Sequence, residues 1–231
     1  IRLGQLDRTE FDDIPYTAVS TEEHKQASLE CALRSAVLLE NDGVLPLSDS
    51  VKTIAVIGPN ADSRDALTGN YNGTADQYVT FLEGIRERFS GRILYSQGCH
   101  LYKDRTQGLA QPGDLYSEAL AAAENSDVIV ACVGLDATLE GEEGDTGNEF
   151  SSGDKNDLRL PESQRTLLQK LSALGKPLVI VLAAGSSVNV EVECNALLDM
   201  WYPGQLGGRA LAQLLFGDVS PSGKLPVTFY R

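Results

Sequence analysis

The chain has 231 residues, 42% of them apolar, which suffices for one well-filled core or two small ones but leaves little room for two complete catalytic modules. Its 33 acidic and 19 basic side chains give a formal net charge of −14, and this charge repels polyphosphates and anionic membrane surfaces. We therefore expect no nucleic acid and no membrane among the partners, and no apolar run approaches the roughly 18 residues of a membrane-spanning helix.

The first 19 residues show no sustained apolar period and contain Gly4 and Pro15, which is typical of a connector. We interpret residues 1–19 as a linker from an upstream domain and residues 20–231 as one domain. Ser20 and Glu23 have the spacing of a capping box, so a helix is predicted to follow and to end at the turn that begins with Asn41. Its apolar face would consist of Ala27, Cys31, Ala32, Ser35 and Leu38.

From residue 50 onward, short β-rich runs alternate with amphipathic helical patterns. Strands are predicted at 53–57, 92–96, 127–133, 177–183, 196–201 and 226–230. Helices are predicted at 81–89, 116–125 and 161–174, and from the glycine pair 207–208 to Gly217. Continuous apolar runs such as VIVACV and LVIVLAA need cover on both faces, so we predict a three-layer α/β sandwich with a mostly parallel, doubly wound sheet.

The loops that leave the first three of these strands are long, whereas the loops that enter strands are short. The long loops span roughly 58–80, 97–115 and 135–160 and leave from carboxyl ends of strands. Open α/β sheets bind ligands at that edge, where the strand order reverses, and in a flavodoxin-like order this point lies between the first and third strands. We therefore expect the site between the first and third loops.

The third loop is strongly acidic, with eight acidic residues against Lys155 and Arg159 between positions 135 and 160. Like charges this close raise the free energy of ionising all of them, so at least one carboxyl should keep its proton toward neutral pH, as a general acid must. A solvated acidic loop, or an incidental set of calcium ligands, would have the same composition. No complete EF-hand pattern is present.

The first loop contains Asn70, Tyr71 and Asn72, whose amide and phenol groups and aromatic face suit polyhydroxy ligands. A turn built on Asn-Gly explains the same residues equally well. Dinucleotide binding is disfavoured because GxGxxG is absent and Pro59 removes an amide donor. A serine hydrolase is disfavoured because the residues around Ser186 do not satisfy GxSxG.

The four cysteines show no CxxC pair and there is no histidine cluster, so the sequence predicts no metal site and no cofactor. Cys31 and Cys132 lie in apolar helix and strand patterns. We therefore expect buried free thiols rather than disulfides.

Several stretches of the chain match a known family. They are ALRSAVLLENDGVLPL, TIAVIGPNAD, GNYNG, VGLDATLEGEEGD, LRLPESQRTLL and WYPGQLGGRALAQLLFGDVSPSGKLPVTFYR, the last being the most specific. On these stretches the chain resembles the carboxy-terminal domain of glycoside hydrolase family 3 from about residue 20 to the end. The opening IRLGQLD looks like the segment that leaves the family's preceding barrel.

The resemblance implies a six-stranded, mostly parallel sandwich with one antiparallel strand, which we assign to the last strand. It implies a retaining, exo-acting β-glycosidase, with β-xylosidase and β-glucosidase the leading specificities, that acts on a β-linked oligosaccharide or an aryl or alkyl glycoside. In such proteins an aspartate nucleophile comes from an upstream TIM-like barrel and a glutamate of this domain is the general acid/base. The match places that glutamate at Glu140, with Glu142 and Glu143 as runners-up. The 231-residue chain alone is then expected to be inactive.

The chain departs from the family pattern at two places. Many members have Asp-Arg where Asp154 and Lys155 stand, and a Glu where Leu206 follows Gln205. A lysine cannot reproduce a bidentate guanidinium contact, so the salt bridge that supports the acidic loop is put in question. The rival interpretation is a non-catalytic module that binds a carbohydrate or a partner through the same loops, and a nucleotide-binding flavodoxin-like domain is the third.

Overall fold

The sheet is the centre of the molecule. The computed structural model describes residues 2–4, 6–103, 109–141, 155 and 157–230. Its strands are β1 (Val37–Asn41), β2 (Thr53–Ile57), β3 (Arg92–Ser96), β4 (Val128–Gly134), β5 (Leu178–Ala183) and β6 (Ala196–Asp199). They form one sheet in the order β1-β6-β5-β4-β2-β3, in which every pair is parallel except β1 with β6.

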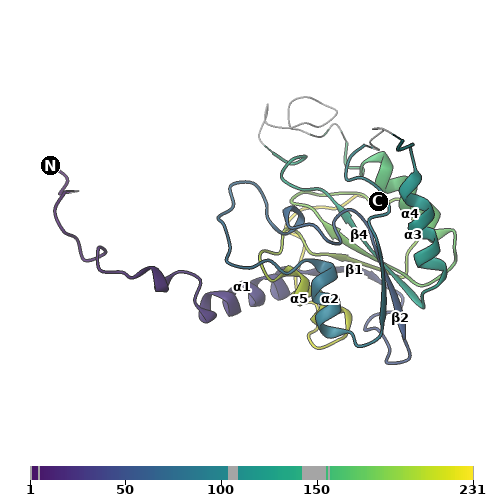
Figure 1. The fold of residues 1–231 in the computed structure, drawn as a ribbon, viewed down its shortest axis with the longest axis horizontal. Coiled ribbons are helices and arrows are strands. Elements are labelled where there is room, and N and C mark those ends of the chain that lie inside the picture. The colour runs from purple at the N-terminus through teal and green to yellow at the C-terminus, as the bar shows by residue number, and fades with distance from the viewer. Residues whose placement is uncertain (1, 5, 104–108, 142–154, 156, 231) are drawn as a thin grey trace.

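Helices cover both faces of this sheet (Figure 1). The helices are α1 (Glu22–Ser35), α2 (Phe81–Arg88), α3 (Asp114–Glu124), α4 (Glu162–Ser172) and α5 (Gly207–Leu215), together with the short 3₁₀ helices η1 (Tyr16–Ala18) and η2 (Asp65–Leu67). One apolar core lies between the sheet and α1, α2 and α5, and a second lies between the sheet and α3 and α4. The predicted three-layer sandwich is therefore confirmed.

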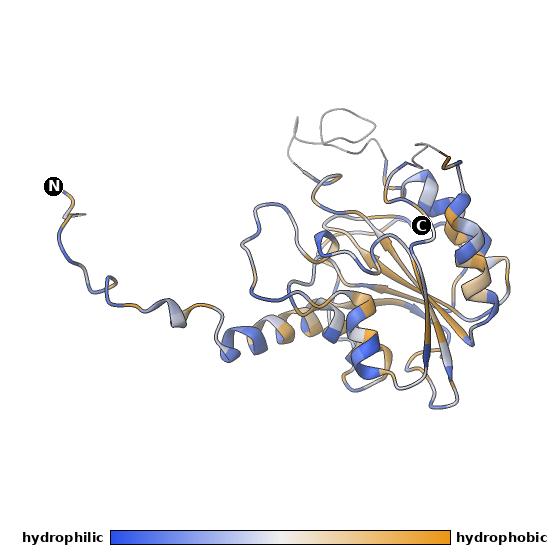
Figure 2. Cartoon of the chain, viewed as in Figure 1, coloured by the Kyte–Doolittle hydropathy of each residue, from blue (hydrophilic) through white to orange (hydrophobic). Residues whose placement is uncertain are grey.

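The strands are buried because successive side chains pack alternately into the core on one face of the sheet and the core on the other. Ile54 and Val56 of β2 enter the first core, whereas Ala55 and Ile57 enter the second. Every residue of β4 and β5 is buried. Figure 2 shows the result as apolar strands between helices whose outer faces are hydrophilic.

The helix starts come from short local signals. Thr80 caps α2, since its hydroxyl accepts a hydrogen bond from the Glu83 amide while the Glu83 carboxylate accepts one from the Thr80 amide. Thr21, one residue later than predicted, caps α1 by accepting from the His24 amide. Ser20 lies outside the helix and donates to Asp76.

The antiparallel strand was assigned to the wrong end of the chain. α1 ends at Ser35, and the next residues form β1, which pairs with β6 from Val37 opposite Asp199 to Asn41 opposite Ala196. Leu38 therefore lies on a strand and not on the predicted helix. Leu38 fits both the helical spacing of the residues before it and the apolar run of an edge strand, so the local sequence allows either structure. Pairing with β6 selects the strand. Residues 226–230 form no strand.

All four cysteines are free, as expected, but they differ in exposure. Cys99 and Cys132 are buried and Cys194 is half-buried, whereas Cys31 is exposed, so the prediction of a buried thiol is wrong for Cys31. Cys31 lies on the face of α1 that points away from the core, whereas its neighbour Ala32 packs in the core.

The described residues before α1 contain only one element, η1, and extend away from the sandwich (Figure 1). Their large apolar side chains are exposed, and these are Leu3, Leu6, Phe11, Ile14, Tyr16 and Val19. Among the described residues no helix is both long and apolar enough to cross a membrane.

Candidate functional site

The predicted reversal of strand order is present in the sheet. β2 lies between β3 and β4, so chain connections diverge from the carboxyl ends of β2 and β4. Asn60, three residues after β2, bridges this point, because its amide N–H donates to the Cys132 carbonyl at 3.3 Å and its side chain donates to the Leu135 carbonyl at 2.9 Å. The first and third loops therefore start from one fixed place.

Glu140 lies at the end of a tight turn that follows β4. Its amide donates to the Asp136 carbonyl at 2.9 Å, and the Asp136 carboxylate accepts from the amide and hydroxyl of Thr138. These local bonds fix the direction in which the Glu140 side chain leaves the chain. That side chain is only 12% exposed.

The Glu140 carboxylate joins the exits of three neighbouring strands. One oxygen, Oε2, accepts from the Gly185 amide at 2.6 Å, just after β5, and from the Tyr202 hydroxyl, just after β6. The other oxygen, Oε1, accepts from the Ser186 hydroxyl and lies 3.9 Å from Nζ of Lys155. We call these five residues, Glu140, Lys155, Gly185, Ser186 and Tyr202, the Glu140 cluster.

Lys155 completes the cluster from the far side of the acidic segment. Its ammonium donates to Oγ of Ser186 at 2.8 Å and to the Ser187 carbonyl at 3.5 Å. Burial lowers the pKa of Lys155, and the charges of Glu140 and Asp157 oppose that effect. At the position where many family members have an arginine, the ammonium of Lys155 therefore contacts the Ser186 hydroxyl and lies near the Glu140 carboxylate. It cannot make the bidentate contact of a guanidinium group.

Tyr202 is a half-buried residue at the centre of the site. Burial raises the pKa of its phenol, and the charge and hydrogen bond of Glu140 raise it further, so the phenol remains a donor. Gly185 must lack a side chain, because a Cβ there would lie 2.9 Å from Cε2 of Tyr202 and 3.3 Å from Oε2 of Glu140. Gly69 packs on the same ring, where a Cβ would lie 3.1 Å from Cδ2, so the first loop also meets the cluster.

A second buried carboxyl, Asp199, ends β6 close to the cluster. Its Oδ1 accepts from the Trp201 amide at 3.0 Å, and its Oδ2 has no hydrogen-bond partner among the described residues. Burial raises the pKa of Asp199 to about 7, the charge of Glu140 adds to this, and the Trp201 amide opposes it. A carboxyl that keeps its proton toward neutral pH is therefore present, although it belongs to β6 and not to the acidic loop.

The other predicted site residues fall into two groups. Glu142 and Glu143 lie outside the described residues. Asn70, Tyr71 and Asn72 lie in the first loop, where Oδ1 of Asn70 accepts from the Tyr71 amide at 3.1 Å and Asn72 donates to the Gly69 carbonyl at 2.9 Å. Tyr71 is 78% exposed, so its ring is accessible. The asparagines stabilise the turn, as one hypothesis expected, and the exposed ring suits the other.

No separate local signal marks Gly185, Ser186 and Tyr202 as members of the site. The residues around Ser186 only argue against a serine nucleophile, because GxSxG is not satisfied. Tyr202 belongs to the most specific family stretch, WYPG, but its contact with Glu140 spans 62 positions of the chain. Polar residues two or three positions after the ends of β4, β5 and β6, namely Asp136, Ser186 and Tyr202, are the one available signal, since those strand ends meet at one edge.

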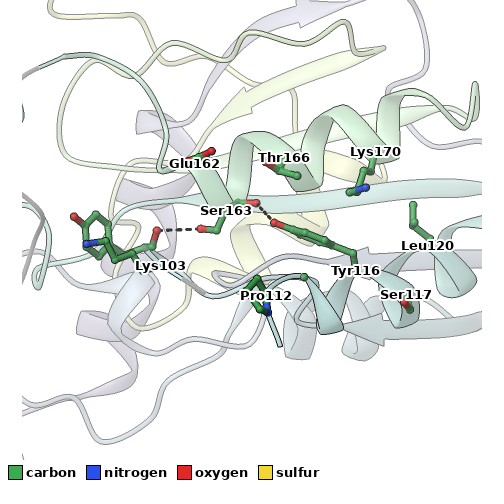
Figure 3. A pocket seen from close by; sticks show the side chains of 11 residues that line it. Lys103, Pro112, Tyr116, Ser117, Leu120, Glu162, Ser163, Thr166 and Lys170 are labelled. Atoms are coloured by element: carbon green, nitrogen blue, oxygen red, sulfur yellow. Dashed lines mark hydrogen bonds between the residues drawn. The ribbon is translucent and has the colours of Figure 1, made fainter. Parts of the chain in front are cut away.

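A pocket of about 600 Å³ lies elsewhere, between α3 and α4 (Figure 3). Two of its polar side chains are bonded within the fold, since the Tyr116 hydroxyl donates to the Ser163 carbonyl and the Ser163 hydroxyl donates to the His100 carbonyl. The Lys170 ammonium lies 5.5 Å from the centre of the Tyr116 ring. The residues that line this pocket include none of the Glu140 cluster.

The fold and the cluster define a doubly wound α/β domain with a polar site at the carboxyl edge of its sheet. The profile of the Glycosyl hydrolase family 3 C-terminal domain matches residues 36–231. The chain belongs to glycosyl hydrolase family 3, of which it is a C-terminal domain.

Relatives of two kinds match it. A probable exo-1,4-β-xylosidase of Aspergillus terreus is 35% identical over 237 residues, which cover 100% of this chain and 28% of that protein. A periplasmic β-glucosidase of Salmonella typhimurium is 38% identical over 231 residues, which cover 90% of this chain and 29% of that protein.

Solved structures agree with this assignment. A β-glucosidase of Erythrobacter marinus has a TM-score of 0.79 at 37% identity, with 92% of this chain and 31% of that chain covered. A β-glucosidase of Listeria innocua in complex with isofagomine has a TM-score of 0.74 at 32% identity, with 91% and 27% covered. The chain spans between 26% and 43% of the length of the curated relatives it matches.

Proposed function

We propose that this chain is the domain that supplies the general acid/base to a retaining, exo-acting β-glycosidase, either a β-xylosidase or a β-glucosidase. The observation that carries the proposal is the place of Glu140, the first residue of the acidic segment, at the carboxyl edge of the sheet. Residues that follow β5 and β6 donate hydrogen bonds to its carboxylate there. Relatives named as β-xylosidases and β-glucosidases support the choice of substrates.

The proposal divides the chemistry between two domains of one protein. A TIM-like barrel upstream would carry the aspartate nucleophile, residues 1–19 would be the linker, and residues 20–231 would be the acid/base domain. The small share of each relative that the chain spans leaves room for such a barrel. The exposed apolar side chains of the first 19 residues also suit a segment that packs on another domain.

Retaining hydrolysis sets a strict distance for this arrangement. Nucleophile and acid/base carboxyls stand about 5 to 5.5 Å apart, so the acidic segment has to face the mouth of the barrel. One of the carboxyls of Glu140, Glu142 and Glu143 would protonate the departing oxygen and then deprotonate the water that frees the glycosyl-enzyme. Asn70, Tyr71 and Asn72 would contact the sugar from the first loop, which meets the cluster at Tyr202.

The test is hydrolysis of a panel of aryl and alkyl β-xylosides and β-glucosides by the full-length protein, with the product anomer determined by NMR. We expect retention of configuration, and no turnover by the 231-residue chain alone. Replacing each of Glu140, Glu142 and Glu143 by Gln then identifies the acid/base, because its loss slows poor leaving groups by roughly 10²- to 10⁴-fold and activated aryl glycosides far less.

Two results would overturn the proposal. Turnover by the isolated chain would refute the division of labour. A full-length protein that binds the glycosides without cleaving any of them would favour the binding module instead.

A further inference from the structure

We propose that Tyr202 is a positioning residue of the hydrolytic reaction, whose hydroxyl holds the Glu140 carboxylate in the place that proton transfer requires. The inference rests on the proposed function, with Glu140 as the acid/base. It adds a residue outside the acidic loop on which that proton transfer depends, and it gives a role to the turn after β6. Tyr202 acts through Glu140 and not on the sugar itself.

The two oxygens of the Glu140 carboxylate are held differently. Oε2 accepts from the Gly185 amide at 2.6 Å and from the Tyr202 hydroxyl, so its donors are a backbone group and the end of a rigid ring. Oε1 accepts from the Ser186 hydroxyl, which rotates, and lies 3.9 Å from the Lys155 ammonium, which ends a flexible stem. Oε2 is therefore the fixed oxygen, and Tyr202 is the one side chain among the described residues that bonds to it.

Glycines of two segments pack against one edge of the Tyr202 ring. A Cβ at Gly185 would lie 2.9 Å from Cε2, and a Cβ at Gly69 would lie 3.1 Å from Cδ2. Neither position therefore accepts a side chain unless the ring moves. The segment after β5 and the first loop together place the ring, and the hydroxyl is placed with it.

The backbone next to Tyr202 adopts a conformation that its neighbours must hold. Trp201 has a φ of 53°, in the left-handed region that bulky residues rarely adopt. The Asp199 carboxyl accepts from the Trp201 amide at 3.0 Å, and the Trp201 indole donates to the Ser35 carbonyl at 3.1 Å. Such strain persists where surrounding contacts over-determine it, and it gathers at functional sites. A turn that places Tyr202 on the acid/base accounts for the strain.

The position of Glu140 matters most for glycosides with poor leaving groups. An alkoxide leaves only when the general acid reaches its oxygen with a proton, whereas an activated phenolate leaves without that help. A misplacement of about 1 Å costs roughly 100-fold in rate. Loss of the Tyr202 hydroxyl should therefore slow the cleavage of alkyl glycosides selectively.

The kinetic experiment compares Tyr202→Phe with Tyr116→Phe in the full-length enzyme, at a temperature where urea titration shows both variants folded. Tyr116 on α3 is the matched control, because its hydroxyl also donates within the fold, to the Ser163 carbonyl at 3.1 Å. For Tyr202→Phe we expect kcat/KM to fall about 10- to 100-fold on alkyl β-glycosides and to stay within about 3-fold of the parent on activated aryl β-glycosides. Tyr116→Phe should match the parent on both.

The split between kcat and KM gives a second criterion. When the glycosyl-enzyme forms fast from an activated aryl glycoside, its hydrolysis limits turnover, and Glu140 then acts as the base. In Tyr202→Phe both kcat and KM on these substrates should fall together, because the intermediate accumulates. A residue that only stabilised the fold would lower activity on both classes of substrate by the same factor.

Two variants of Asp199 test the turn. Asp199→Asn keeps an acceptor for the Trp201 amide and should keep the parent's preference between alkyl and aryl glycosides. Asp199→Ala removes the acceptor and should repeat the selective loss of Tyr202→Phe. Because both changes act through the same contact, combining Asp199→Ala with Tyr202→Phe should add little.

Three results overturn the inference. One is an equal loss of kcat/KM on alkyl and activated aryl glycosides in Tyr202→Phe, and another is no loss on either. In both cases a parent enzyme that hydrolyses glycosides with retention leaves the proposed function standing. The third is the identification of Glu142 or Glu143 as the acid/base by the glutamine variants.

A readout without substrate separates the contact from the chemistry. Hydrogen exchange at the Gly185 amide should accelerate in Tyr202→Phe and not in Tyr116→Phe, because that amide donates to the oxygen that Tyr202 holds. Unchanged exchange in Tyr202→Phe refutes the positioning role whether or not the protein is active. A full-length parent that hydrolyses no glycoside refutes the proposed function, and the catalytic role of Tyr202 with it, even where the exchange accelerates.

Discussion

Replacing Asp199 by Asn should change how the stability of the chain depends on pH. Asp199 is fully buried at the end of β6, and burial raises its pKa from 3.8 to about 7. Between pH 4 and pH 7 the folded state then holds a proton that the unfolded state has released. Stability contributed by Asp199 is therefore fully present below pH 4 and is lost as the pH rises to about 7.

The size of the effect follows from the two pKa values. At about 1.4 kcal/mol for each pH unit, the difference between 3.8 and 7 amounts to about 4 kcal/mol, of which about 3 kcal/mol falls between pH 5 and pH 8. Asparagine keeps an acceptor for the Trp201 amide and carries no charge at any of these pH values. The variant should therefore gain about 3 kcal/mol relative to the parent on going from pH 5 to pH 8.

Urea unfolding at several pH values between 5 and 8 measures this difference. Asp218→Asn is the control, because the hydrogen bond from Arg88 lowers the pKa of the exposed Asp218 below its usual range and its titration falls below this window. Stability curves of parent and Asp199→Asn that run parallel from pH 5 to pH 8 would refute the argument, since they would show that Asp199 does not titrate there.

Three further predictions concern other parts of the fold. Tyr202→Phe should lower the free energy of unfolding by about 1.5 to 3 kcal/mol in urea titrations, because it removes a hydrogen bond to the Glu140 carboxylate, and a loss below 0.5 kcal/mol would contradict that bond. Thr80→Ala should cost about 1 kcal/mol by losing the cap of α2, and Thr80→Ser should cost less, so equal losses would argue against capping. Iodoacetamide should alkylate the exposed Cys31 in the folded chain but spare the buried Cys132, because burial raises the pKa of the Cys132 thiol. Mass spectrometry of tryptic peptides measures the modification, and faster alkylation of Cys132 than of Cys31 would contradict this prediction.

The parallel part of the sheet could be predicted from the sequence because its signals are local. The strands 53–57 and 92–96 were placed to the residue, since turn residues bound each β-rich run. The order of β2, β3 and β4 followed from the rule that governs doubly wound sheets. β1 escaped prediction because its partner, β6, is about 160 residues away, and only that pairing separates an edge strand from one more turn of α1.

The position of the Glu140 cluster in the fold was predictable, but its composition was not. Long loops at strand ends indicated the sheet edge at which this cluster lies, and the family resemblance pointed to the acidic loop. The sheet brings three turns, at 140, 185 and 202, within hydrogen-bond distance of one another. This arrangement, and not the local sequence, determines which groups donate to the Glu140 carboxylate. A tight turn after β5 that is open enough for Tyr202 requires glycine at 185, and nothing in the local sequence distinguishes this glycine from a loop residue.

Glu140 and Asp199 are two carboxyls that interact at this edge, and their interaction links stability to the site. Glu140 and Lys155 form one ion pair in a poorly exposed place, so a second ionised carboxyl nearby has no counter-charge among the described residues that pack on the cluster. Asp199 is that second carboxyl, and burial, together with the charge of Glu140, raises its pKa to about 7. Above that pH its ionisation places an unpaired charge beside Glu140, two residues from the turn that holds Trp201 and Tyr202. The hydrogen bonds of the Glu140 cluster are therefore expected to be most stable on the acidic side of neutrality.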